Sequence, residues 1–384
     1  MKNIPYARQS IDQQDIRLVS KILRSDWITQ GPMVEKFERA LANYCGAKYA
    51  VAVSSGTAAL HLACLVAGLK KGDEAITTPI TFLATPNSIL YTGAKPVFAD
   101  IDYDTVNIDP EKIKAVISKR TKAILPVHFA GLPCDMAKID KIAKSNSIIV
   151  IEDACHALGA KYKCGKKWIK VGSCKHSDMT VFSFHPVKHI TTGEGGVITT
   201  NNRNYYQRLK ALRSHGVYKN AEITREKGLW YYEMRELGFN YRITDFACAL
   251  GLSQLKKLNL FVEKRKKIAL FYDLSITGID RQSDATHNKK HAYHLYVIKI
   301  DFKKHDLDRR AFINKMKKSG IDTQVHYIPV YRQPYYKKAF HISPNVYPNA
   351  EKYYKRTVSI PIFFNMSSAE IRYVAKAITK ALIS

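Results

Sequence analysis

The sequence predicts an α/β fold in which a mostly parallel sheet of seven strands forms a large domain and a smaller C-terminal α+β domain follows. Short apolar runs alternate with helical patterns up to residue 213, and such alternation gives a parallel sheet with helices on both faces. The length of 384 residues also suits two cores rather than one. We expect a large domain at 1–255, with an N-terminal arm at 1–30, and a small domain at 256–384.

The elements of the large domain follow from two patterns. Each strand is predicted by a short apolar run bounded by glycine, proline or polar residues: 49–53, 75–78, 97–100, 123–127, 148–151, 180–184 and 196–200. Helices are predicted where apolar residues recur at helical spacing, as Leu60, Cys64 and Ala67 do before Gly68 ends the first helix. The predicted helices are 57–69, 83–91, 110–117, 136–144 and 203–213.

The C-terminal part has a different order of elements. A helical stretch from 244 to about 274 links the two domains. After it, 292–300 and 323–327 are predicted strands, and 307–318 is a predicted helix. Strands and helices of this mixed order are typical of a small α+β domain.

One lysine, Lys188, lies between an apolar strand and the glycine-rich turn that opens the next strand. Short, stiff backbone at the sheet edge places its amine where it can form a Schiff base with a carbonyl cofactor. Upstream, an apolar run ends at Glu152 and Asp153. Alone, these residues are a surface lysine and a strand-end carboxylate. Together they predict pyridoxal phosphate (PLP), whose ring nitrogen needs a carboxylate and whose aldehyde needs an amine.

A phosphate site is predicted where the first strand runs through Gly56 into a helix. Free backbone amides and the helix dipole at that N-terminus favour an anion, and Thr57 adds a hydroxyl. A lone Ser-Gly-Thr is more often an ordinary helix cap. Its place before the first helix of an α/β sheet favours phosphate.

Five ordered motifs resemble those of the DegT-type PLP-dependent sugar aminotransferases, and the resemblance covers almost the whole chain. The motifs are 53–60, 78–82, 152–156, 183–196 and 238–242. The resemblance implies a PLP-dependent transferase of fold type I, similar to aspartate aminotransferase. It also implies pyridoxal 5'-phosphate as cofactor and L-glutamate as amino donor.

The same resemblance implies further cofactor contacts. Phe82 would stack on the pyridine ring, His156 would lie beside the ring oxygen, and Ser183 would add a phosphate contact. The residues themselves leave two alternatives open, a core phenylalanine at Phe82 and a purely structural histidine at His156.

The resemblance also implies a homodimer with shared active sites, in which the loop carrying Asn240 reaches the cofactor phosphate of the neighbouring subunit. Arg242 in that loop is either an anion contact or a structural residue. His326 and Tyr327, within 324–331, are the other expected substrate-binding residues.

Lys188 favours transamination over dehydration, because the related sugar 3-dehydrases carry histidine at that position. Lys188, Asp153 and His156 are thus the expected catalytic residues. Within the family, the chain most resembles members of the pseudaminic-acid pathway, which implies UDP-2-acetamido-2,6-dideoxy-β-L-arabino-hex-4-ulose as substrate. Another UDP- or dTDP-4-keto sugar, of the viosamine, bacillosamine or 4-amino-arabinose type, is the alternative.

The net charge of +28 raises a different class of function, nucleic-acid binding. The lysines are spread along the chain and no recognised nucleic-acid-binding module occurs, so we expect a solvated basic surface whose rim attracts an anionic substrate. A regulatory protein without activity would be expected to lack Lys188 or Asp153. The lysine-rich segment 161–175 has no explanation in the sequence.

Apolar runs, cysteines and histidines give predictions about the cellular location of the protein and about metal binding. No apolar run reaches the roughly 18 residues of a membrane span, and the first residues lack the apolar core of a signal peptide. Seven scattered cysteines predict reduced thiols in a cytoplasm. Cysteines and histidines between 155 and 176 fit no zinc spacing, so we expect no metal and no membrane association.

Overall fold

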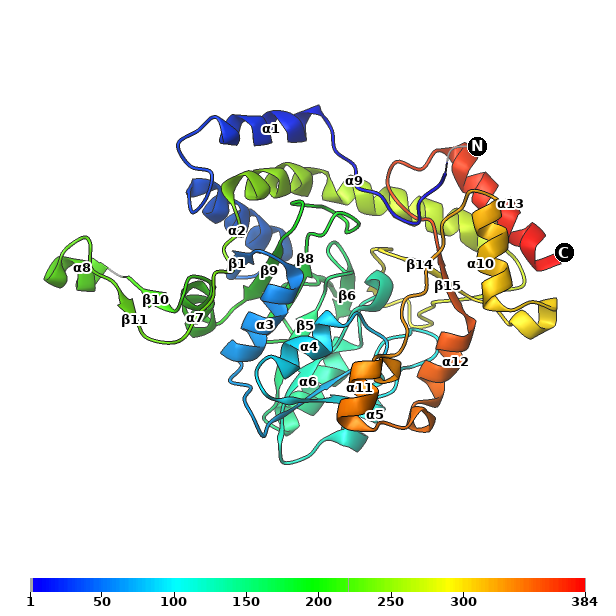
Figure 1. Cartoon of the computed structure of the whole chain (residues 1–384), viewed down its shortest axis with the longest axis horizontal. Helices are drawn as coiled ribbons and strands as arrows, with labels where there is room; N and C mark the ends of the chain where they lie inside the picture. Colours follow the sequence, from blue (N-terminus) through cyan, green and yellow to red (C-terminus); the bar gives the residue numbers. More distant parts are fainter. Residues whose placement is uncertain (1–2, 220, 384) are drawn as a thin grey trace.

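A seven-stranded sheet forms the centre of the molecule (Figure 1). The structure, a computed structural model, describes residues 3–219 and 221–383. The strand order is β1-β9-β8-β5-β4-β2-β3, and β9 alone in this sheet runs antiparallel to its neighbours. The predicted mostly parallel sheet is confirmed. Its strands are β1 (Tyr49–Val53), β2 (Glu74–Thr77), β3 (Lys95–Phe98), β4 (Thr121–Leu125), β5 (Ile149–Asp153), β8 (Met179–Ser183) and β9 (Gly196–Thr200).

Helices cover both faces of this sheet, as predicted. Along β1, Ala50 and Ala52 belong to one buried core while Val51 and Val53 belong to another, because successive side chains of a strand point to opposite faces. The helices that the sequence predicted here are α3 (Gly56–Val66), α4 (Ala84–Leu90), α5 (Pro110–Val116), α6 (Met136–Ser145) and α7 (Arg203–Arg213).

Some predicted boundaries were wrong by a few residues. Strands β3 and β4 each begin and end two residues earlier than expected. β3 tolerates Pro96 because it is an edge strand, where a missing backbone donor breaks no ladder. Helix α3 ends at Val66, since Gly68 adopts a left-handed conformation with φ of 80°.

Two N-terminal helices were not predicted. α1 (Gln13–Leu23) lies in the expected arm 1–30, of which residues 1 and 2 fall outside the described part, and α2 (Pro32–Cys45) follows. A capping box between Asp12 and Asp15 starts α1. Asp15 then accepts hydrogen bonds from Gln254 and Lys257, which fixes α1 along α9 (Asp245–Ser275).

Helix α9, predicted at 244–274, contributes to two cores. Phe261 packs with the large sheet, and Ile268 packs with a small sheet of order β12-β14-β15. The division at residue 255 stays a prediction. The C-terminal elements are β12 (Asp280–Arg281), β14 (Tyr296–Lys299), α10 (Arg309–Lys318), α11 (Pro334–Phe340), α12 (Pro348–Arg356), β15 (Thr357–Ile360) and α13 (Ser368–Ile383).

The predicted strand 323–327 is wrong. Only an isolated bridge joins Gln324 to Ser359, and β14 pairs with β15 instead. The predicted strand 292–300 is shorter, because the backbone N–H groups of Ala292 and Leu295 donate to the loop at 130–131. In both segments the backbone pairs with the small sheet over fewer residues than predicted.

The lysine-rich segment 161–175 forms a hairpin. β6 (Lys161–Cys164) and β7 (Lys167–Lys170) pair with each other, and β13 (Lys289–Lys290) joins them. The amines of Lys163 and Lys290 lie 5.4 and 4.4 Å from the ring centroid of Trp168. Cation–π contacts therefore give some of these lysines a structural role.

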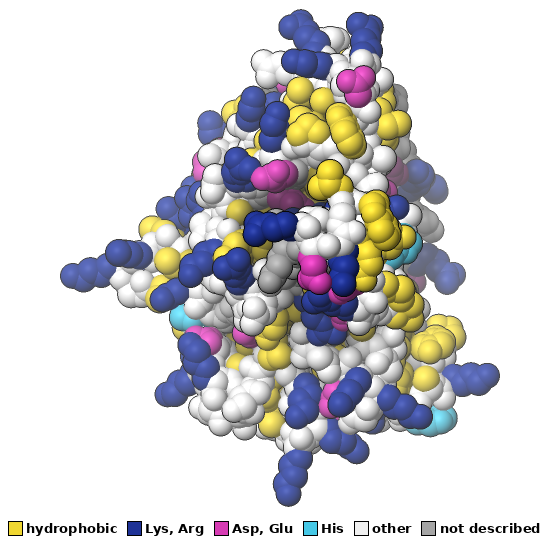
Figure 2. All heavy atoms as spheres, turned by 90° about the vertical axis from the view of Figure 1, so that its left-hand side faces the viewer, with side chains coloured by type: hydrophobic (Ala, Val, Ile, Leu, Met, Phe, Trp, Pro, Cys, Tyr) yellow, Lys and Arg dark blue, Asp and Glu magenta, His cyan; other side chains and the backbone are white. Residues whose placement is uncertain are grey.

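A projecting arm extends away from the body of the molecule (Figure 1). It comprises residues 217–219 and 221–237, with β10 (Val217–Tyr218), α8 (Ala221–Lys227) and β11 (Glu233–Met234). Figure 2 looks onto the side from which the arm extends and shows lysine and arginine side chains over the whole face, not gathered into one stripe. No helix within the described residues is long and apolar enough to cross a membrane.

Candidate active site

A cavity of about 440 Å³ opens where β5 and β8 end and α3 begins. The carboxyl edge of a parallel sheet is where α/β folds bind ligands. Nine of the eleven residues that the sequence analysis singled out line it: Gly56, Thr57, Phe82, Asp153, His156, Ser183, Lys188, His326 and Tyr327. Asn240 and Arg242 do not.

The floor of the cavity is an anion cradle, formed by the start of α3 and the end of β8. Ser55 caps α3 by accepting a hydrogen bond from the N–H of Ala58 at 3.1 Å. A Cβ atom at Gly56 would lie 2.8 Å from Cβ of Ser183, so only glycine permits this approach. The helix N-terminus, Thr57 and Ser183 thus meet at one point, an arrangement that fits a phosphate group.

Asp153 ends β5 with its carboxylate held by two donors. The hydroxyl of Thr85 donates to Oδ2 at 2.6 Å, and the N–H of Cys155 donates to Oδ1 at 3.1 Å. Thr85 also hydrogen-bonds the hydroxyl of Thr81 at 2.9 Å. Sequence reasoning missed Thr85, although it lies three residues after Phe82 in the first turn of α4.

Lys188 projects from the loop between β8 and β9. Its backbone N–H donates to the carbonyl of His185 at 2.9 Å, which tightens the loop. Burial lowers the pKa of the Lys188 amine, although the charge of Asp153 acts in the opposite direction. A lysine whose neutral form is favoured is a better nucleophile and base.

His156 lies in a cluster of aromatic and imidazole rings. Its Nε2 is 3.2 Å from the hydroxyl of Tyr327, and its ring centroid is 4.3 Å from that of His294. Burial lowers the pKa of His156 well below its ordinary value, and the nearby charge of Lys188 adds to this. Nδ1 of His156 is buried without a hydrogen-bond partner among the described residues. Such an orphaned nitrogen fits a ligand atom.

The outer wall carries Phe82, His326 and Tyr327. Phe82 is 59% exposed, so the alternative that it is a core residue is wrong. Its ring centroid lies 6.1 Å from that of Tyr327. His326 is fixed by a 2.8 Å contact between Nδ1 and the hydroxyl of Ser359, and burial lowers its pKa to about 3.

Asn240 is exposed and Arg242 is half-buried, both outside the cavity. Their loop nevertheless runs beside the anion cradle, because the N–H of Ser54 donates to the carbonyl of Tyr241 at 2.9 Å. Asn240 pairs with Ser214 through an isolated antiparallel bridge. Within this chain, neither side chain reaches the cavity.

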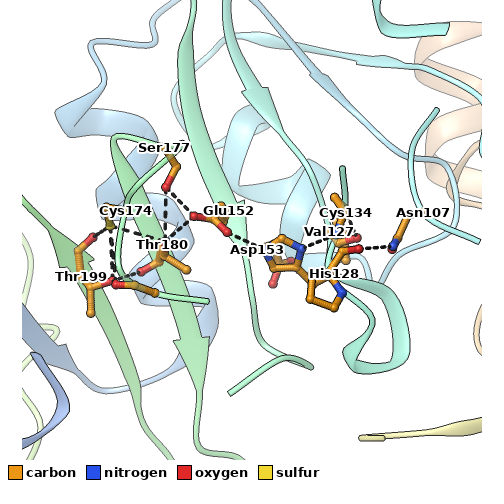
Figure 3. A network of polar contacts seen from close by, with 12 residues as sticks. Asn107, Val127, His128, Cys134, Glu152, Asp153, Cys174, Ser177, Thr180 and Thr199 are labelled. Carbon is orange, nitrogen blue, oxygen red and sulfur yellow. Dashed lines mark hydrogen bonds and ion pairs between the residues drawn. The ribbon is translucent and has the colours of Figure 1, made fainter. Parts of the chain in front are cut away.

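Behind Asp153, a buried polar network fixes the end of β5 (Figure 3). Glu152 accepts hydrogen bonds from Ser177, from Thr180 at 2.8 Å and from Nε2 of His128 at 2.6 Å. The N–H of His128 in turn donates to the carbonyl of Asp153 at 3.1 Å. Glu152 therefore helps to hold the backbone of Asp153 through His128, from the other face of the sheet.

These features fit PLP. The start of α3 approaches Ser183 closely because Gly56 has no side chain, and the buried Asp153 carboxylate and the Lys188 amine line the same cavity as this cradle. Within residues 3–219 and 221–383, no group of three or more His, Cys, Asp or Glu side chains is arranged to hold a metal ion.

Comparisons with known proteins agree with this site. The model of the DegT/DnrJ/EryC1/StrS aminotransferase family matches residues 9–379. UDP-4-amino-4,6-dideoxy-N-acetyl-beta-L-altrosamine transaminase of Campylobacter jejuni is 42% identical over 376 residues, covering 97% of this chain and 95% of that protein.

Solved structures are similar over the whole length. Helicobacter pylori PseC, an aminotransferase involved in the biosynthesis of pseudoaminic acid, matches with a TM-score of 0.89 and 33% identity over 99% of both chains. The PLP form of the putative sugar aminotransferase Spr1654 from Streptococcus pneumoniae matches with a TM-score of 0.89 and 30% identity, over 99% of this chain and 98% of that one. This chain therefore belongs to the DegT/DnrJ/EryC1/StrS aminotransferase family and is a PLP-dependent sugar aminotransferase of fold type I.

Proposed function

We propose that the enzyme transfers the amino group of L-glutamate to C4 of UDP-2-acetamido-2,6-dideoxy-β-L-arabino-hex-4-ulose. The product is UDP-4-amino-4,6-dideoxy-N-acetyl-β-L-altrosamine, on the route to pseudaminic acid. The observation that carries the chemistry is the meeting of Lys188, Asp153 and the anion cradle in one cavity. The activities of the Campylobacter jejuni and Helicobacter pylori relatives support this substrate.

Each part of the cavity has a role in holding the cofactor. The first amides of α3, with the hydroxyls of Thr57 and Ser183, bind the phosphate. Asp153 pairs with the ring nitrogen, and Phe82 packs on one face of the ring. The orphaned Nδ1 of His156 is a candidate contact for a ring substituent, and it makes His156 part of the catalytic set.

Lys188 moves the proton. PLP, when bound, supplies an aldehyde that carries the amino group and a protonated ring that withdraws electrons from the reacting carbon. Once free, the Lys188 amine takes the proton from the donor carbon and later returns a proton to C4 of the sugar. Its lowered pKa leaves more of the amine neutral and ready to accept that proton.

The sugar nucleotide is anionic, and the entrance offers groups that suit it. His326 and Tyr327 line the outer wall, and the half-buried Arg242 lies on the loop beside the cradle. The high positive charge of the chain, +28, adds attraction at long range.

We also propose a homodimer with shared active sites. Leu229, Trp230 and Leu237 on the projecting arm are each more than three-quarters exposed, at 83%, 77% and 77%. Exposed apolar groups of this kind mark a protein interface, and a second copy would bring the exposed Asn240 to the neighbouring cradle. The cytoplasm is the proposed compartment, since all seven cysteines, each within the described residues, are free thiols.

One assay series tests this function. Purified enzyme should be yellow, and L-glutamate should shift its absorbance. The converted enzyme should return to its original spectrum only with a keto sugar that it aminates. A panel of UDP- and dTDP-4-keto sugars should give the highest kcat/KM with the UDP-β-L-arabino-hex-4-ulose. A higher value for a dTDP sugar would replace the proposed substrate but not the transaminase.

A further inference from the structure

His294 lies beside the Lys188 amine, in the wall of the active-site cavity. It is 3% exposed, and its Nε2 is 3.5 Å from Nζ of Lys188. With Lys188 as the donor in this contact, Nε2 is the acceptor and the ring proton of neutral His294 lies on Nδ1. No protein acceptor within the described residues meets Nδ1. The contact with Lys188 therefore fixes the rotation of the ring.

The backbone of His294 is held from two other elements. The guanidinium of Arg265, on α9, donates to the carbonyl of His294 at 3.3 Å and to that of Tyr293 at 3.2 Å. The N–H of Leu295 donates to the carbonyl of Ala130 at 3.3 Å. These bonds leave the imidazole little freedom to move away from Lys188.

The surroundings also keep His294 neutral. The titratable and charged groups that face it are Lys188, His156, His189 and Arg265. Burial lowers the pKa of His294 well below its ordinary value, and the positive charge of Lys188 lowers it further. His294 therefore stays an acceptor at neutral pH.

We propose that His294 is a positioning residue for Lys188, accepting a hydrogen bond from its amine and holding that amine towards the reacting carbon. The inference rests on the proposed function, because that function makes Lys188 the group that moves the proton. A neutral acceptor suits this purpose. A carboxylate at the same place would stabilise the ammonium form, whereas imidazole orients the amine without adding a negative charge.

Two variants separate positioning from packing. His294→Phe keeps a ring of similar size but has no acceptor, and His294→Gln places an amide oxygen near the position of Nε2. In single turnover with L-glutamate, followed by cofactor absorbance, we expect His294→Phe to react at least about tenfold more slowly than the wild type, since one hydrogen bond is lost. His294→Gln should remain within about threefold. If His294→Phe does not fold, His294→Asn replaces it, because the shorter asparagine side chain places its oxygen farther from Lys188.

A second measurement does not depend on turnover. In the full chain freed of cofactor, the pH dependence of Lys188 labelling by an amine reagent, read by peptide mass spectrometry, gives the pKa of its amine. Loss of the acceptor should lower that pKa further in His294→Phe, and His294→Gln should restore it. His291→Gln is the control, because the half-buried His291 pairs with Gln282 at 2.9 Å and not with Lys188. It should change neither readout.

Three results bear on the inference. Wild-type turnover and labelling in His294→Phe would overturn it, and so would equal defects in His294→Phe and His294→Gln. If the proposed function is wrong, the result differs: L-glutamate would not change the cofactor absorbance of the wild type itself. The labelling experiment would then still decide whether His294 contacts Lys188.

Discussion

Asp153, at the end of β5, and Lys188, in the loop between β8 and β9, line the same cavity, and each has its own neighbours. Asp153 is buried, and two donors, the hydroxyl of Thr85 and the N–H of Cys155, satisfy its carboxylate. Among the described residues, the Lys188 amine has a hydrogen-bond partner only in His294, and burial lowers its pKa, which favours the neutral amine.

Lys188→Ala should abolish turnover without loss of the fold. Alanine removes the amine, while the backbone hydrogen bond from Lys188 to His185 remains. Borohydride treatment of the wild type should attach the cofactor to the peptide that contains Lys188, as mass spectrometry would show. Lys170→Ala is the control, since this half-buried lysine donates to Tyr44 far from the cavity. Label on any other lysine contradicts the assignment.

Asp153→Asn should slow turnover at least about a hundredfold, roughly 2.7 kcal/mol of barrier. Asparagine keeps the shape and can still accept from Thr85 or Cys155, but it lacks the negative charge that keeps the ring nitrogen protonated. Asp178→Asn is the matched control: Asp178 lies at the opposite end of β8, where it accepts from the N–H of Val150 at 2.9 Å. Single-turnover rates with L-glutamate give the comparison. Equal rates for Asp153→Asn and wild type would assign the ring nitrogen to another residue.

At the scale of elements, the two faces of β5 differ. On one face the Glu152 carboxylate is held by hydrogen bonds, and on the other Asp153 lines the cavity. Glu152 and Asp153 are adjacent and therefore point to opposite faces. Burial raises the pKa of Glu152, but hydrogen bonds from His128, Ser177 and Thr180 outweigh this and hold it below its ordinary value. The backbone N–H of Cys134 donates to Nδ1 of His128 at 3.0 Å. The imidazole must therefore present its Nε2–H to Glu152.

Glu152→Gln should destabilise the fold by at least about 2 kcal/mol. Glutamine offers one acceptor oxygen in place of two, so it cannot accept both from the Nε2–H of His128 and from the hydroxyls of Ser177 and Thr180. Urea unfolding measures the change. Glu35→Gln is the control, because the Glu35–Arg39 pair is exposed and such pairs contribute little.

The same variant should alter the acid dependence of stability. A carboxyl whose pKa is depressed in the folded state contributes stability above its unfolded pKa of about 4.3, and that contribution is lost as the pH falls through the folded value. The wild type should therefore lose more stability than Glu152→Gln between about pH 5 and about pH 3. Parallel acid dependences would show that Glu152 does not titrate as described.

The parallel sheet was predictable because its strands are short apolar runs separated by helices with clear starts. The residues at the strand ends, Gly56, Asp153 and Lys188, could be placed for the same reason. The predicted strand 323–327 failed because its alternating pattern serves two partners: Gln324 bridges to Ser359, while Tyr327 turns into the cavity. Local pattern cannot distinguish a strand from such a segment.

His294 and Thr85 were missed for another reason. Each acts through a partner more than sixty residues away, Lys188 for His294 and Asp153 for Thr85. Neither stands in a local pattern that would single it out. The fold brings these pairs together, so a single sequence gives no signal for them.

At the scale of the molecule, the C-terminal part supplies one wall of the cavity, whereas the nearby loop that carries Asn240 supplies no lining residue. His326, Tyr327 and His294 come from the C-terminal part and close one wall. The loop with Asn240 runs beside the cradle but its side chain is exposed. The exposed projecting arm leaves the body close to that loop, as Figure 1 shows. A two-fold dimer would place each Asn240 at the other subunit's cavity.

Mixing two inactive variants tests the shared site. In a two-fold dimer, each chain gives Lys188 to one site and Asn240 to the other, so a heterodimer of Lys188→Ala and Asn240→Ala chains has both lesions in one site and leaves the other intact. Asn240→Ala alone should weaken cofactor retention, because a buried phosphate loses a donor. After unfolding and refolding together, half of the dimers are mixed, and activity should rise towards about a quarter of the wild type. Unmixed variants refolded separately are the control. If the mixture shows only the average activity of its two parents, Asn240 serves its own chain and the sites are not shared.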